Sequence, residues 1–136
     1  MSNPTTTMCV DLKQFRIRIY KTTLHSLGDP KYIQILVNPN DKAVAIRSVD
    51  VEMSGDQTFR INFQQLTRYS YVINSRTFTE KLCEIDETLE PNGSYRLSGY
   101  IIPDKRIAIF PLSTIYKIEI KESVNEQPFT PNFDNR

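Results

Sequence analysis

Apolar and polar residues alternate in the first clear element of the chain. Phe15, Ile17 and Ile19 fall on one face of this stretch, and the two arginines between them fall on the other. A period of two residues is typical of a strand with one buried face. The sequence therefore predicts a half-buried strand over 15–20.

The next apolar spacing is helical. Leu24 and Leu27 lie on one side of a predicted helix over 21–27, and Gly28 followed by Pro30 ends it. Alternation then returns on both sides of a polar turn. The pattern predicts a hairpin of 33–37 and 44–46 around the turn at 38–41, and then a strand over 59–63.

The second half follows the same order. A β-rich run over 69–73 leads to Ser75, the predicted N-cap of a helix over 76–89. The apolar stripe of this helix consists of Phe78, Leu82, Ile85 and Leu89. Beyond the turn, the pattern predicts a hairpin of 95–102 and 105–110 and a last strand over 116–120.

Two passages of the chain resemble each other. Tyr32–Ile46 and Tyr95–Ile109 both run from Tyr through an alternating stretch to Pro, Asp-Lys and an apolar-Ala-Ile triplet. We interpret them as parts of a tandem repeat whose halves share one core, because each half is short for a separate domain. The predicted fold class is α+β, with two β-α-β-β-β repeats over 14–65 and 68–121.

The predicted domain boundaries follow from this repeat. A single duplicated domain covers 10–122, after a flexible N-terminus at 1–9. Periodicity disappears at 123–136, which predicts a flexible tail. Within the tail, Gln127–Phe133 carries two phenylalanines on a proline-stiffened segment, which also suits docking on a groove or a neighbouring subunit.

The composition describes an ordinary soluble domain. The chain has 136 residues, 24% of them charged, and a net charge of +1, which neither demands nor excludes nucleic acid. It lacks a long apolar run and a basic leader, so we expect neither a membrane span nor a secretory signal. Cys9 and Cys83 are too few for a disulfide framework or a zinc site. We therefore expect a cytoplasmic protein.

The residues that catalysis needs are scarce. His25 is the single histidine, and the sequence contains no phosphate-binding loop, nucleophile motif or metal-binding motif. Cys83 stands beside Glu84, which does not favour a reactive thiolate. We therefore predict that the protein is not an enzyme, and we assign it no catalytic residue, metal or cofactor.

Basic residues cluster in or beside the two predicted β-α junctions. They are Arg16, Arg18, Lys21, Arg76 and Lys81. Together with hydroxyl groups nearby in the sequence, these cations could bind a phosphate backbone without reading the bases. The neighbouring hydroxyls belong to Thr22, Ser26, Thr77 and Thr79. Solvated cations on exposed faces are the alternative, and Glu80, Glu84 and Glu87 on the longer helix favour it.

The element order and the repeat resemble the domain of DNA sliding clamps, the processivity-factor family that includes the bacterial β clamp and the proliferating cell nuclear antigen. The resemblance covers roughly Val10–Lys121. It implies a homo-oligomeric ring around duplex DNA, a hexamer for a one-domain subunit, which tethers a polymerase or another DNA-processing protein without sequence specificity. Transferred by position, the DNA-facing residues are Lys21, Thr22, His25, Arg76 and Lys81.

Three other functions stay open at this point, the least favoured being an enzyme whose site forms between subunits. A small β-rich interaction or regulatory module would bind a protein partner through its sheet edges or tail, as a monomer or a dimer. A saddle like that of the TATA-box-binding protein would need exposed intercalating aromatics, but Phe59, Phe63 and Phe110 fit a core better.

Overall fold

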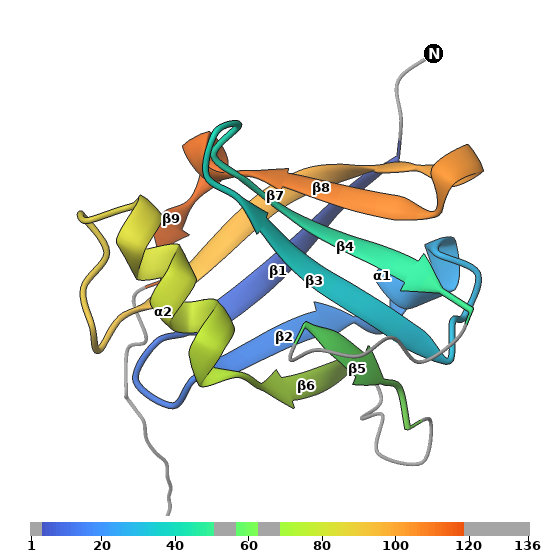
Figure 1. The fold of residues 1–136 in the computed structure, drawn as a ribbon, viewed down its shortest axis with the longest axis horizontal. Helices are drawn as coiled ribbons and strands as arrows, with labels where there is room; N and C mark the ends of the chain where they lie inside the picture. The colour runs from blue at the N-terminus through green and yellow to red at the C-terminus, as the bar shows by residue number, and fades with distance from the viewer. Residues whose placement is uncertain (1–3, 51–56, 63–68, 119–136) are drawn as a thin grey trace, which may run out of the picture.

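Strands dominate the fold of the computed structural model, which describes residues 4–50, 57–62 and 69–118 (Figure 1). The strands are β1 (Thr5–Asp11), β2 (Arg16–Tyr20), β3 (Tyr32–Asn38), β4 (Ala43–Val49), β5 (Thr58–Arg60), β6 (Ser70–Asn74), β7 (Ser94–Ile102), β8 (Ile107–Pro111) and β9 (Tyr116–Lys117). The helices are α1 (Lys21–Ser26), α2 (Arg76–Ile85) and the short 3₁₀ turns η2 (Pro103–Lys105) and η3 (Leu112–Thr114).

The strands form one antiparallel sheet that curls into a half-barrel. Its order is β5-β3-β4-β8-β7-β1-β2-β6, and β9 adds to β7. The two end strands approach each other through a side chain: the Tyr71 hydroxyl of β6 donates to the Arg60 carbonyl at 3.2 Å and accepts from the Asn62 amide at 3.3 Å. The fold is thus mixed but strand-dominated, and the predicted α+β class is not confirmed.

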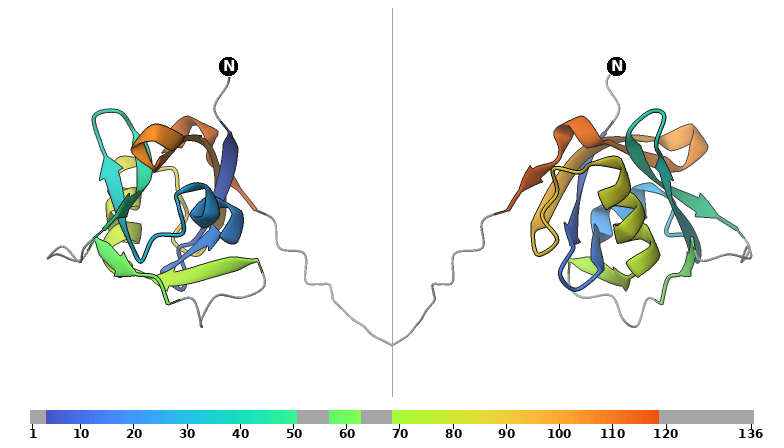
Figure 2. Two further views of the ribbon diagram at one scale, coloured as in Figure 1. Left: turned by 90° about the vertical axis from the view of Figure 1, so that its right-hand side faces the viewer. Right: turned by 60° about the vertical axis from the view of Figure 1, so that its left-hand side comes forward.

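The core lies inside the curved sheet, and the two helices cover its opposite ends (Figure 2). Alternate strand residues point inward, among them Ile17 and Ile19 of β2, which are fully buried. From α1, Leu24 joins the same apolar cluster, and from α2, Phe78 and Leu82 join it. Burial of this shared cluster is the main source of stability.

Two predicted helix signals are confirmed. The Ser75 hydroxyl accepts a hydrogen bond from the Phe78 amide at 3.1 Å and so caps α2. Gly28 follows the end of α1 with φ +89°, a left-handed conformation that glycine adopts without strain.

The second helix is shorter than the sequence predicts. It ends at Ile85 rather than Leu89. Asp86 has an extended backbone, and its carboxylate accepts hydrogen bonds from the amide and the hydroxyl of Thr88. This local turn supplies hydrogen bonds after Ile85 that do not require the helix to continue. Leu89 is buried nonetheless, from the loop rather than from the helix.

The expected flexible N-terminus at 1–9 is wrong where the structure describes it. Thr5–Asp11 forms β1, a central strand paired along its length with β7 and along its second half with β2. Met8 and Val10 point into the core and are fully buried. A run of threonines looks polar, yet threonine is β-branched and suits a strand. The tail at 123–136 lies outside the described residues.

The tandem repeat is not confirmed, although β2-α1-β3-β4-β5 and β6-α2-β7-β8-β9 follow the predicted order. Alignment of the two similar passages makes Ala45 of the first hairpin equivalent to Ala108 of the second. The strand register and the burial pattern of the two hairpins instead make Val44 equivalent to Ala108. A shift of one residue reverses the two faces of a strand. The final strands also differ: β5 lies on the edge of β3 away from β4, whereas β9 lies on the β8 side of β7.

Strand pairing follows a different twofold pattern. β1 pairs with β7 on the edge away from β8, just as β5 pairs with β3 on the edge away from β4. In addition, β4 pairs with β8 and β2 pairs with β6. Matching units would therefore each begin one strand earlier, as β-β-α-β-β. The match is incomplete, because β1 forms a ladder with β2 whereas no ladder joins β5 to β6 among the described residues.

Leu82→Ala should lower the free energy of unfolding by about 2–5 kcal/mol, because the side chain is fully buried between α2 and the sheet. Chemical denaturation measures this difference. Glu84→Ala on the exposed face of the same helix is the control and should change stability by less than about 0.5 kcal/mol. Superimposable curves for Leu82→Ala and the unsubstituted protein would contradict the packing of α2.

Candidate functional site

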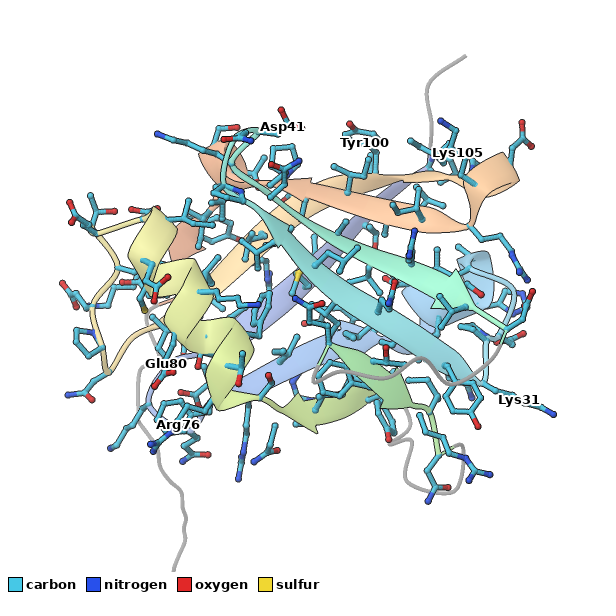
Figure 3. All side chains as sticks on the ribbon, viewed as in Figure 1. Lys31, Asp41, Arg76, Glu80, Tyr100 and Lys105 are labelled. Carbon is cyan, nitrogen blue, oxygen red and sulfur yellow. The ribbon has the colours of Figure 1, made fainter. Side chains whose placement is uncertain are left out.

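The structure does not bring the five predicted DNA-facing residues together. Lys21, Thr22 and His25 lie on α1, whereas Arg76 and Lys81 lie on α2 at the other end of the half-barrel (Figures 1 and 3). The two helices therefore do not present one surface. The predicted residues form two separate groups, one at each end of the core.

Two of these residues have partners within the protein. His25 Nδ1 lies 3.0 Å from Asp29 Oδ2 in an exposed pair. The Arg76 guanidinium lies 4.4 Å from the ring centroid of Phe15, in a cation–π contact at the turn between β1 and β2. Exposed contacts of this kind contribute little to stability. The contact with Phe15 shows that Arg76, although exposed, also packs against the turn between β1 and β2.

A different group of basic residues meets on the outer face of the sheet. Antiparallel partners lie on the same face, and the register aligns one residue from each of five strands. The row, in order across β9, β7, β1, β2 and β6, is Tyr116, Arg96, Cys9, Arg18 and Val72. Arg16 lies two positions before Arg18 on the same face of β2.

All of these residues except Tyr116 line a cavity of about 300 Å³. Three arginines from two strands, Arg16, Arg18 and Arg96, line it together with Tyr20. The remaining lining residues are Cys9, Val10, Asp11, Val72, Ser94 and Ile118. This recess on the sheet therefore carries several positive charges within reach of one another.

The arginines of this recess have no carboxylate partner in the described part of the chain, whose ion pairs lie elsewhere. Asp11 is the one acidic residue of the lining. Its Oδ1 accepts hydrogen bonds from the Lys13 and Gln14 amides, at 3.0 and 3.3 Å, and holds the β1–β2 turn. The recess is therefore positively charged and suited to an anion.

Neighbouring polar groups fix the arginine side chains. Arg18 donates from Nη1 to the Ser70 hydroxyl at 2.6 Å. Hydrogen bonding to Cys9 and Tyr116 raises the pKa of Arg96, so its positive charge is secure. The Arg96 Nε atom is buried and has no hydrogen-bond acceptor among the described residues. A buried donor without an acceptor is unfavourable unless a ligand or water supplies one.

Tyr20 borders the same recess with a neutral hydroxyl. Its oxygen lies 3.4 Å from the Cys9 sulfur. This hydrogen bond and burial raise the pKa of Tyr20, so the phenol stays protonated at neutral pH. It offers a hydrogen-bond donor and an aromatic ring beside the arginines.

The described residues contain no group of three or more His, Cys, Asp or Glu side chains arranged to hold a metal ion. Burial and the charges of Asp86 and Glu80 raise the pKa of the Cys83 thiol and so disfavour the thiolate. The sequence alone predicts the same effect but from the neighbouring Glu84. None of the helices in residues 4–50, 57–62 and 69–118 is long and apolar enough to cross a membrane.

Comparisons with protein-family models, with curated proteins and with solved structures find no match. Nothing in them identifies a sliding-clamp family, so that resemblance stays a prediction.

Sequence reasoning found Arg16 and Arg18 but missed Arg96 and Tyr116. Alternation along 94–102 does place Arg96 on the face opposite Leu97. Its proximity to Arg18 depends on β1, which lies between their strands. Without β1 in the predicted sheet, the three arginines could not be recognised as one group.

Cys83 should react slowly with iodoacetamide, because the rate follows the thiolate fraction. In a Cys9→Ser variant, the pH midpoint of alkylation should lie above that of the same variant unfolded in urea. Glu80→Gln should move the folded midpoint part of the way down, since it removes one of the charges that disfavour the thiolate. A folded midpoint equal to or below the unfolded one would contradict this assignment.

Proposed function

We propose that the protein is a non-catalytic module that binds the phosphate backbone of nucleic acid through the outer face of its sheet. The observation that carries this proposal is the meeting of Arg16, Arg18 and Arg96 in one recess without a carboxylate partner in the described chain. Arginine forks match phosphate oxygens in geometry as well as charge.

The kind of contact supports binding without sequence specificity. Guanidinium and hydroxyl groups contact phosphates, and phosphate contacts carry no base information. Both helices of the structure cover ends of the core, and α1 has only six residues. A helix that enters a DNA groove to read bases is therefore not part of this proposal.

The sheet face is a better candidate than the helices for this contact. The helix cations are divided between two ends of the molecule, and one of them contacts Phe15. The sheet cations converge on one recess. The protein-interaction module remains the second candidate, because the same charges would also accept an acidic segment of a protein partner.

Changing Arg16, Arg18 and Arg96 together to Gln should abolish binding of a fluorescein-labelled oligonucleotide of mixed sequence at moderate salt, measured by anisotropy. Three lost phosphate contacts should also reduce the slope of log K against log salt by about 2–3. The matched control removes three charges from the helices, by Lys21→Gln, Arg76→Gln and Lys81→Gln. It should bind almost as well as the unsubstituted protein.

The opposite result for the two triple variants would transfer the interface to the helices and favour the sliding-clamp arrangement. Circular dichroism and thermal unfolding of both variants check that the fold is retained. Failure of the unsubstituted protein to bind any oligonucleotide at low salt would contradict nucleic-acid binding and leave the protein-interaction module.

The ring implied by the sliding-clamp resemblance has its own test. One domain of 15.8 kDa cannot surround a duplex, so a clamp-like assembly must be a closed oligomer, with six copies favoured. Native mass spectrometry or sedimentation should then give a discrete closed species. A strict monomer at micromolar concentration would contradict the ring and leave the sheet-face proposal intact, because that face needs no partner subunit.

A further inference from the structure

The recess has an exposed aromatic ring directly beside it. Tyr116 of β9 is the ladder partner of Arg96, so the two side chains leave the sheet on the same face. Tyr116 is 51% exposed although its side chain is large and partly apolar. Proteins that bind single strands combine exposed aromatic rings, on which bases stack, with positive charges that bind the phosphates.

The spacing of the cations suits a flexible strand. Arg96 and Arg18 flank Cys9 from the two neighbouring strands. Their backbones are therefore separated by two strand spacings, roughly 10 Å. Cys9 is small, so the two guanidiniums have room to bind one phosphate from both sides.

The recess disfavours a duplex. A cavity of about 300 Å³ lies within the sheet surface, with Val72 closing the row on the β6 side. The bases of a duplex are paired inside its helix and cannot reach a ring at the edge of this cavity. A single strand can turn one base outward and place its phosphate in the recess.

We propose that this face binds single-stranded nucleic acid, with a phosphate between Arg18 and Arg96 and the adjoining base stacked on Tyr116. The inference rests on the proposed function and names its substrate class. Arg16 and the Tyr20 hydroxyl contact the next part of the backbone. The site accepts any base, because every base offers a π face.

Three labelled probes of equal length test the inference: oligothymidine, an abasic strand and a duplex. Oligothymidine should bind most tightly at the same salt concentration. Compared with Tyr116→Phe, Tyr116→Leu should weaken oligothymidine about 5- to 150-fold, the range expected for one stacked base, and should leave the abasic strand unchanged. Tyr116→Phe is the reference variant for this comparison, because it keeps the ring and, like Tyr116→Leu, removes the hydroxyl that hydrogen-bonds to Arg96.

The matched control is Tyr100→Leu. Tyr100 is exposed on β7 (Figure 3), on the same face as Arg96 but further along the strand, and it does not line the recess. This variant should bind all three probes as the unsubstituted protein does. Thermal unfolding of each variant verifies that β9 and β7 remain in place.

The outcomes separate this inference from the proposed function. Equal binding of all three probes, lost together in the triple arginine variant, would overturn the single-strand assignment and keep phosphate binding. If Tyr116→Leu weakened oligothymidine and the abasic strand equally when compared with Tyr116→Phe, base stacking would also be overturned. Absence of binding to all three probes would overturn the proposed function itself.

Discussion

The insertion of β1 between β7 and β2 is the constraint on which the rest of the structure depends. This strand is hydrogen-bonded on both edges and joins the first elements of the chain to the hairpin near its end. Its inward residues, Met8 and Val10, are fully buried in the core. Its outward residue Cys9 lies between Arg18 and Arg96. One strand therefore completes the core and assembles the candidate site.

Strand alternation separates these two tasks. In β2, Ile17 and Ile19 face the core, while Arg18 faces the recess. A change on the outer face therefore leaves the inner packing almost untouched. The helices have no such division, since α1 and α2 close the ends of the core and carry their cations at opposite ends of the molecule. This difference is why the sheet, rather than the helices, can present several charges as one surface.

Local signals in the sequence predicted most of the helices and strands. They did not predict how the strands are arranged relative to one another. The Ser75 cap, the Gly28 termination of α1 and both hairpins have short-range chemical causes that a sequence displays. The end of α2 at Ile85 depends on Asp86, a residue whose side chain competes with the helix. Strand order and register depend instead on distant partners. The pairing of Arg96 with Cys9, and hence the candidate site, belongs to this second kind.

The outer face carries charges that the fold does not need. Arg16, Arg18 and Arg96 repel one another, and the buried Nε of Arg96 has no acceptor among the described residues. Neither feature supports the core, whose residues all lie on the other side of the sheet. A phosphate in the recess would offset the repulsion and accept a hydrogen bond from Arg96 at once. The unfavourable features of the free protein and the chemistry of the proposed ligand thus have one common explanation.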